Sequence, residues 1–125
     1  MNFNKVSFAL TNSIKIKQIS NTEFQLTTSI IYPNKQAMIL FIKKINNNWI
    51  LTDKKQTLKQ MNFIYDLNSK DTIKAIRKII TAYDFQMKNG VLLTEINEND
   101  LSQKVLEFLM CIGHLMNMYV FFELD

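Results

Sequence analysis

Residues 23–30 have the sequence Glu-Phe-Gln-Leu-Thr-Thr-Ser-Ile, and this stretch decides the fold class. Polar residues alternate along it with residues that are apolar or Thr. The polar ones are Glu23, Gln25, Thr27 and Ser29, and the others are Phe24, Leu26, Thr28 and Ile30. A period of two is typical of a strand that has one face in the core and the other in water. We therefore predict a half-buried strand here.

The same pattern extends in both directions along the first half of the chain. Ile14 and Ile16 alternate with Lys15 and Lys17, which predicts an earlier strand. Residues 37–42 are apolar on both faces, as in a central strand, and residues 49–51 predict a fourth strand. Turn residues at 20–22, 32–35 and 46–48 separate these segments. Four strands with short connections predict an antiparallel β-meander.

The second half of the chain changes to helical spacing. Apolar residues recur every three or four positions, at Ile73, Ile76, Ile80 and Tyr83, and again at Leu101, Val105, Phe108, Leu109, Ile112, Leu115 and Tyr119. Ser69 or Asp71 is a candidate cap for the first helix, and Asn99 or Asp100 for the second, which is long and apolar.

Two shorter elements complete the predicted architecture. Lys88-Asn89-Gly90 is a hairpin signal between residues 85–87 and 91–96. Phe3, Val6 and Leu10 have the spacing of a short N-terminal helix. The expected fold class is α+β: a meander of about four strands plus a hairpin, packed against two to three helices. No linker separates the halves, so we expect one domain over residues 1–125.

Composition excludes several kinds of protein. The chain has 125 residues, of which 47% are hydrophobic, enough for a folded core. One Cys and one His exclude a disulfide framework and a zinc site. Two glycines are too few for a phosphate loop or a dinucleotide fingerprint. We expect no metal and no cofactor.

Charge is distributed unevenly along the chain. Residues 1–60 hold nine Lys against Glu23 and Asp53, a net charge of +7, whereas residues 61–125 hold six basic and nine acidic side chains, a net charge of −3. The two halves sum to the net charge of +4. The strand-rich half is thus basic and the helical half mildly acidic.

The basic half supplies the first candidate site. The lysines that we expect to contact a polyanion or a protein partner are Lys15, Lys17, Lys35, Lys43, Lys44, Lys54 and Lys55, and Lys59 adds to the basic surface. Lysines on the outer face of a sheet can follow a phosphate backbone, and Trp49, Tyr32 or Phe41 can stack on bases. The alternative is a solvated face whose lysines protect a strand edge. Arg, the usual bidentate reader of guanine and phosphate, occurs once, and Asn, Ile and Lys codons are AT-rich, so codon bias is a second source of the lysines.

Asp53 follows the fourth strand directly, in the sequence Leu51-Thr52-Asp53. A carboxylate in that place is a candidate ligand or general base. The alternative interpretation is structural: Asp53 as N-cap, with Gln56 three residues later, resembles a capping box that starts a short helix through Leu58 and Met61. We favour the cap.

These residues also carry a resemblance. The segments 23–28, 38–42 and 49–53, followed by Thr57-Leu58, resemble a bacterial family called domain of unknown function 1828, over roughly residues 13–120. Leu51-Thr52-Asp53 with Thr57-Leu58 is its sharpest motif. The resemblance implies a fold and a setting in bacteria and prophage-like mobile elements, and it implies no activity. Family members have a partly acidic turn after the second strand; here residues 30–36 contain no carboxylate.

Other candidates have simpler interpretations. Cys111 and His114 are three residues apart on one predicted helix, but no orienting group or oxyanion donor is near in sequence, so we expect Cys111 to pack in the core. The acidic residues Glu95, Glu98, Asp100 and Glu107 surround the start of the last helix and favour its dipole. Their spacing does not match a calcium loop.

The Met-rich and aromatic end of the chain leaves two alternatives open. Met110, Met116 and Met118 belong to it, together with Val120 and the aromatic side chains that follow. Such side chains are either core residues or an adaptable protein interface, including a homodimer formed through the C-terminal helix. The candidate interface residues are Met116, Met118, Tyr119, Phe121 and Phe122.

The sequence therefore favours binding over catalysis. We expect a small, non-enzymatic accessory protein of a phage or mobile element that binds a protein partner, for example as an inhibitor of a host nucleic-acid or defence machine. The alternative is a nucleic-acid-binding module that uses a lysine-rich sheet face. Residues 1–5 lack the features of a signal peptide, and Gly113, His114 and Asn117 interrupt the apolar stretch 105–122. We expect a cytoplasmic protein that makes no contact with membranes.

Overall fold

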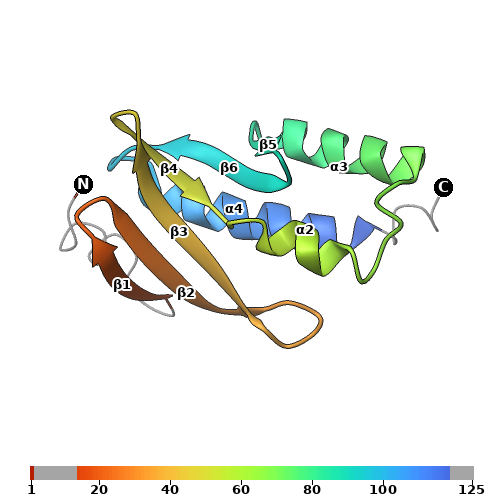
Figure 1. The fold of residues 1–125 in the computed structure, drawn as a ribbon, viewed down its shortest axis with the longest axis horizontal. Helices are drawn as coiled ribbons and strands as arrows, with labels where there is room; N and C mark the ends of the chain where they lie inside the picture. Colours follow the sequence, from red (N-terminus) through yellow and green to blue (C-terminus); the bar gives the residue numbers. More distant parts are fainter. Residues whose placement is uncertain (2–13, 119–125) are drawn as a thin grey trace.

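The computed structural model describes residue 1 and residues 14–118, and its strands form one antiparallel sheet (Figure 1). The strands are β1 (Ile14–Ser20), β2 (Glu23–Ile31), β3 (Ala37–Ile45), β4 (Asn48–Thr52), β5 (Gln86–Lys88) and β6 (Val91–Ile96). Their order in the sheet is β1-β2-β3-β4-β6-β5. The predicted meander and the predicted hairpin are both present, and β6 joins them by pairing with β4.

Three helices accompany the sheet in the described part of the chain. They are α2 (Gln56–Met61), α3 (Lys70–Ala82) and α4 (Leu101–Met116). Figure 1 shows α4 lying behind the sheet, with α2 and α3 beside it and no described helix in front of β1 to β4. The α+β class, with a long C-terminal helix, is thus confirmed. The predicted N-terminal helix around Phe3, Val6 and Leu10 lies outside the described residues.

Two hairpin turns explain the tight connections. Asn46 and Asn47 have φ values of 50° and 67°, and Asn89 and Gly90 have values of 54° and 80°. Positive φ at both central residues is what a type I′ turn requires, and this turn matches the twist of the flanking strands. Asn tolerates this left-handed conformation better than most residues, so the sequence marks these turns clearly.

The core lies between the sheet and α4. The alternation in β2 buries Phe24 and Leu26 completely, and α4 meets them with Phe108, Ile112 and Leu115, all without exposed surface. Burial of apolar surface at this seam is the main force that holds the helix to the sheet. The strand residues between these buried ones face the opposite side of the sheet.

The predicted helix caps are only partly correct. Ser69 and Asp100 occupy the N-cap positions of α3 and α4, but neither side chain bonds to an amide of its helix. The Asp100 carboxylate instead accepts the backbone N–H of Asn97 at 2.9 Å, and the Asn97 side-chain oxygen accepts the N–H groups of Asn99 and Asp100. These polar side chains stabilise the turn before α4, an alternative to capping that short polar residues commonly adopt.

Candidate functional site: the open sheet face and the lysine hollow

The strand register places some of the lysines on the side of the sheet that α4 does not cover. Lys15 lies opposite Thr27, which lies opposite Ile39. Residues that lie opposite each other in a ladder project from the same face. The open face, as we call it, consists of Lys15, Lys17, Glu23, Gln25, Thr27, Ile39, Phe41, Lys43 and Ile50, and it continues through Thr52, Leu93 and the exposed Glu95. It combines exposed lysines with half-buried apolar side chains.

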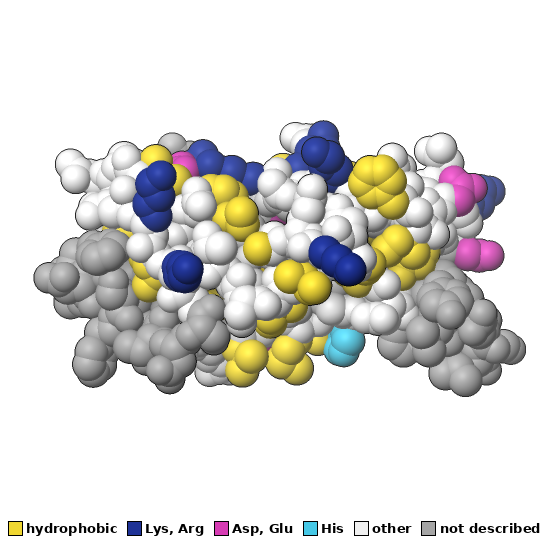
Figure 2. Space-filling model, turned by 90° about the horizontal axis from the view of Figure 1, so that it is seen from below, with side chains coloured by type: hydrophobic (Ala, Val, Ile, Leu, Met, Phe, Trp, Pro, Cys, Tyr) yellow, Lys and Arg dark blue, Asp and Glu magenta, His cyan; other side chains and the backbone are white. Residues whose placement is uncertain are grey.

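Lys44 is on the other side of the sheet. It pairs with Trp49, and both project toward the side that α4 covers, because neighbouring residues in a strand alternate between faces. Lys35 is in the turn before β3, whereas Lys43 is near the far end of that strand, six residues or about 20 Å beyond its first residue, Ala37. The seven predicted lysines therefore do not form one patch. Figure 2 likewise shows Lys and Arg side chains standing apart on the face of the molecule seen there.

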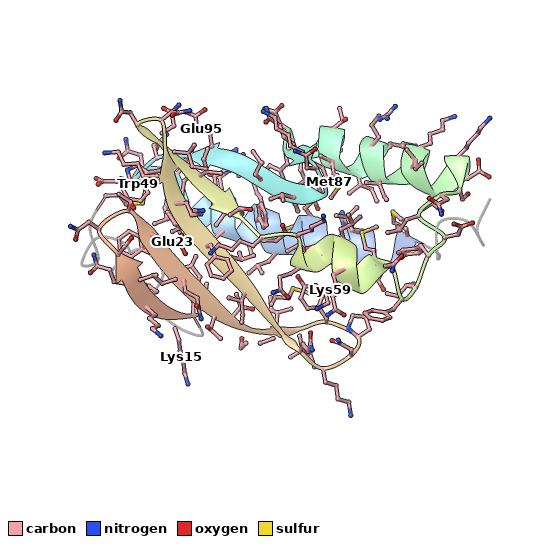
Figure 3. All side chains as sticks on the ribbon, in the orientation of Figure 1. Lys15, Glu23, Trp49, Lys59, Met87 and Glu95 are labelled. Atoms are coloured by element: carbon pink, nitrogen blue, oxygen red, sulfur yellow. The ribbon has the colours of Figure 1, made fainter. Side chains whose placement is uncertain are left out.

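Glu23 joins two of the predicted lysines. The Glu23 carboxylate is 2.9 Å from the Lys54 ammonium and 3.8 Å from that of Lys43. The Lys54 Nζ atom also lies 4.0 Å from the centre of the Phe41 ring, a cation–π contact. Figure 3 shows Glu23 over the middle of the sheet, with Lys15 pointing away from it. One carboxylate thus offsets the charge of two lysines, whereas the residues directly opposite Lys15 and Lys17 are the uncharged Thr27 and Gln25.

Three aromatic residues were proposed to stack on bases, and one of them, Phe41, lies on the open face. Tyr32 is buried, and its hydroxyl lies 3.3 Å from that of Thr57. Trp49 belongs to the covered side, where its ring packs against Phe24 at 6.0 Å between centres. The expectation for Tyr32 and Trp49 is therefore wrong, because one belongs to the core and the other projects from the wrong face.

The contacts of Asp53 are those of a residue that stabilises the fold. It is completely buried, and its carboxylate accepts three backbone N–H groups, from Lys55 at 2.9 Å, Thr57 at 3.0 Å and Leu92 at 3.1 Å. Two of these amides are at the start of α2, so the carboxylate satisfies backbone donors there, as the structural interpretation predicted. The prediction that Asp53 is the N-cap residue is wrong, because the helix begins at Gln56 and Lys55 occupies the N-cap position, two residues after Asp53.

A hollow opens beside Asp53, on the outer surface of α2. It has a volume of about 580 Å³ and is lined by Lys54, Lys55, Gln56, Leu58, Lys59, Asn62 and Leu67. Three lysines thus surround one concavity whose lining contains no carboxylate. The sequence identified these lysines as part of a basic surface, but Asn62 carried no signal that placed it with them. Helical spacing places Asn62 beside the lysines, since it follows Lys59 by three residues and so lies on the same side of the helix.

Cys111 and His114 do not form a site together. Cys111 is fully buried, as predicted, and desolvation, with a smaller contribution from the Asp53 charge, raises the pKa of its thiol to about 12. His114 is exposed, and its Nδ1 atom lies 2.8 Å from the Tyr83 hydroxyl. A neutral thiol in the core is a weak nucleophile, since the thiolate is the reactive form.

The predicted interface at the end of the chain divides into two parts. Met116 and Met118 are buried in the core, in agreement with the first of the two alternatives for this segment, whereas Met110 is half-exposed on α4. Tyr119, Phe121 and Phe122 lie outside the described residues.

The described part of the chain contains neither a metal-binding cluster nor a helix that could span a membrane. Within residues 1 and 14–118, no group of three or more His, Cys, Asp or Glu side chains is arranged to hold a metal ion. None of the helices in this part of the chain is long and apolar enough to cross a membrane.

Comparison with known proteins defines the class. The fold is an antiparallel α+β sheet closed on one side by a C-terminal helix, and residues 28–114 match the family described as domain of unknown function DUF1828. Because the match covers more than half of the chain, the protein belongs to this family. The match includes the Leu51-Thr52-Asp53 motif and begins after Thr27. No curated protein and no solved structure shows significant similarity to the chain.

Proposed function

We propose that this protein acts without catalysis, by binding an acidic protein partner through the open face. The single observation that carries the proposal is the composition of that face: exposed Lys15 and Lys17 lie in the same ladder rows as the half-buried Ile39 and Phe41. Apolar side chains beside lysines can bury area against a partner, while the lysines select for negative charge.

The proposal extends to a biological setting. A small, basic-faced binding protein suits an inhibitor of a host nucleic-acid or defence machine carried by a phage or mobile element. The support is the asymmetry of charge, +7 in residues 1–60 and −3 in residues 61–125, together with the resemblance described above. A positive face meets acidic protein surfaces and does not imitate DNA.

Nucleic-acid binding is the second candidate, and one observation favours it. Lys15 and Lys17 are two residues apart on the solvent side of β1, an arrangement that can follow successive phosphates. Phe41, in the row of Lys17, offers a ring for stacking, although Lys54 partly covers it.

One pair of variants tests the proposed surface. Lys15→Glu/Lys17→Glu reverses the charge of the open face and keeps the β1 edge charged, so it should not promote aggregation. Lys44→Glu/Lys78→Glu makes the same change in net charge at exposed positions away from this face. We expect a partner captured from bacterial extract by the wild type to be retained by the second variant and lost by the first.

The same variants separate the two candidates. Fluorescence anisotropy with single- and double-stranded oligonucleotides at several salt concentrations measures direct nucleic-acid binding. Tight binding that weakens steeply with salt and disappears in Lys15→Glu/Lys17→Glu would replace the protein partner by nucleic acid. Equal capture of the same protein by both variants would refute the open face as the binding surface.

A further inference from the structure

The lining of the lysine hollow contains none of the open-face residues, although Lys54, at its rim, also contacts Glu23 and Phe41. Its lining comes from one continuous segment, the connection after β4 together with α2 and the loop that follows. At about 580 Å³ it has the size of pockets that accept small ligands. Leu58 and Leu67 supply apolar wall, and the other lining residues are lysines and side-chain amides. The hollow therefore offers donors and an apolar surface together.

The charges of the hollow are largely uncompensated. Lys55 and Lys59 are four residues apart and Asn62 follows three residues later, so all three lie along one side of α2. Like charges at this spacing repel each other. Among residues 1 and 14–118, no acidic group forms an ion pair with Lys55 or Lys59. An anion in the hollow would relieve the repulsion between them.

The backbone holds two of the lysines in an unusual conformation. Lys54 and Lys55 have φ values of 50° and 74°, in the left-handed region that Gly or Asn adopts at lower cost. Hydrogen bonds from the Lys54 N–H to the Thr52 hydroxyl and from the Lys55 N–H to Asp53 fix this conformation. The geometry thus places two long cationic side chains where the backbone alone would favour a smaller residue.

Tight packing positions the Lys55 side chain. A Cβ atom added to Gly90 would lie 2.9 Å from the Lys55 Cε atom and 2.6 Å from a methyl group of Leu58. The hydrocarbon chain of Lys55 therefore lies against the β5–β6 turn, and this contact excludes some of its rotamers before any ligand binds. Such preorganisation lowers the entropic cost of binding.

We infer that the hollow binds a phosphate-bearing ligand of nucleotide size, with the ammonium groups of Lys55 and Lys59 at the phosphate and Lys54, which is paired with Glu23, at the rim. Leu58 and Leu67 would contact the less polar part of the ligand, and Asn62 would donate a hydrogen bond. The phosphate belongs either to a free nucleotide or to a nucleic-acid backbone, since both present the same group. The site goes beyond the proposed function, because it shares no residue with the open face.

The test uses the full chain, three probes and one pair of variants. The probes are inorganic phosphate, adenosine triphosphate and a short oligothymidylate, titrated while backbone amide shifts are recorded by NMR. Lys55→Gln/Lys59→Gln removes two charges from the hollow and keeps side-chain length, and Lys44→Gln/Lys78→Gln removes two charges elsewhere. We expect shifts confined to residues 54–62 and affinity at least about tenfold weaker in the first variant alone.

Each outcome has a definite meaning. Binding of phosphate or adenosine triphosphate with this pattern supports the site with a free ligand, and binding of the oligonucleotide alone with this pattern supports it with a nucleic-acid phosphate. Equal affinity in the two variants, or the absence of shifts at residues 54–62 with every probe, overturns the inference. If Lys55→Gln/Lys59→Gln does not fold, the shift map of the wild type decides.

Discussion

The backbone N–H of Leu92 donates to the buried carboxylate of Asp53 at 3.1 Å, and this bond connects the end of β4 to β6. The Asp53 N–H in turn donates to the Leu92 carbonyl at 3.3 Å. The same carboxylate holds the start of α2, so one side chain fixes a strand pairing and a helix start. Asp53 therefore stabilises the backbone at this junction, and through its bond to the Lys55 N–H it helps to position the lysines of the hollow.

Replacing Asp53 should be severely destabilising. In Asp53→Ala, three backbone N–H groups would lose their acceptor, two of them in buried surroundings. An unsatisfied buried donor costs about 1–3 kcal/mol, so we expect the free energy of unfolding to fall by at least about 3 kcal/mol in urea titrations. Asp66→Ala is the matched control, because Asp66 accepts one exposed N–H, from Asn68. A fall no larger than that of Asp66→Ala would contradict the role of Asp53.

The two glycines should respond in opposite directions to replacement by Ala. Gly90→Ala adds a Cβ atom at φ 80°, where it meets Leu58 and Lys55, so we expect a loss of more than about 1 kcal/mol. Gly113 is inside α4 and has no heavy atom within 4 Å of an added Cβ, so Gly113→Ala should stabilise by about 0.5–1 kcal/mol. Thermal unfolding of both variants measures the difference, and effects of equal sign would contradict it.

Neutralising Glu23 should strengthen the binding of anions. Glu23→Gln frees Lys54 and Lys43 from their carboxylate, so both the hollow and the open face become more positive. We expect adenosine triphosphate to bind several-fold more tightly by titration calorimetry at low salt, with the gain shrinking as salt rises. The lost ion pairs are partly exposed and should change stability by at most about 1 kcal/mol. Weaker binding by Glu23→Gln would show that Lys54 needs Glu23 to hold its position.

Stability should decline at alkaline pH through two buried groups. Desolvation raises the pKa of Cys111 from 9.0 to about 12 and that of Tyr32 from 10.0 to about 12, and the nearby Asp53 charge adds to both shifts. The unfolded chain therefore loses these protons first, so stability is complete below about pH 9 and falls as the pH rises toward 12. Each group contributes up to about 1.4 kcal/mol per pH unit above its ordinary pKa.

Cys111→Ala isolates the thiol contribution to this decline. Its unfolding free energy in urea should fall less between pH 8 and pH 10 than that of the wild type, because Tyr32 begins to contribute only near the upper limit. The cavity left by the sulfur lowers stability equally at both pH values and cancels in the comparison. An identical fall in the two proteins would exclude the thiol as the cause.

Local sequence signals predicted the elements and their turns. Alternation in residues 23–30 identified β2, and Asn46-Asn47 and Asn89-Gly90 marked two hairpins because few residues accept left-handed conformations. Pairing between β4 and β6 was not predictable in this way, since it joins segments roughly 40 residues apart and leaves no local pattern. The sequence thus predicted a meander and a hairpin, and the structure joins them in one sheet.

The candidate site was harder to predict for the same reason. Lys43 and Lys44 are adjacent in sequence, but β3 sends them to opposite faces. Glu23 and Lys54 are 31 residues apart, and their ion pair exists only because β2 and the end of β4 are brought near the same part of the sheet. The number of lysines predicted that the surface is positively charged, but it did not predict that these lysines are divided between an open face and a hollow.

The position of β6 between β4 and β5 has a consequence for the order of folding. Strands β1 to β4 form sequentially local hairpins, whereas the β4–β6 ladder requires a long loop to close first, at an entropic cost. We expect the meander and the β5–β6 hairpin to appear early and the central ladder to form in the rate-limiting step. Because Asp53 bonds to Leu92 across this same ladder, the hollow and its lysines would become organised only when the chain has completed that closure.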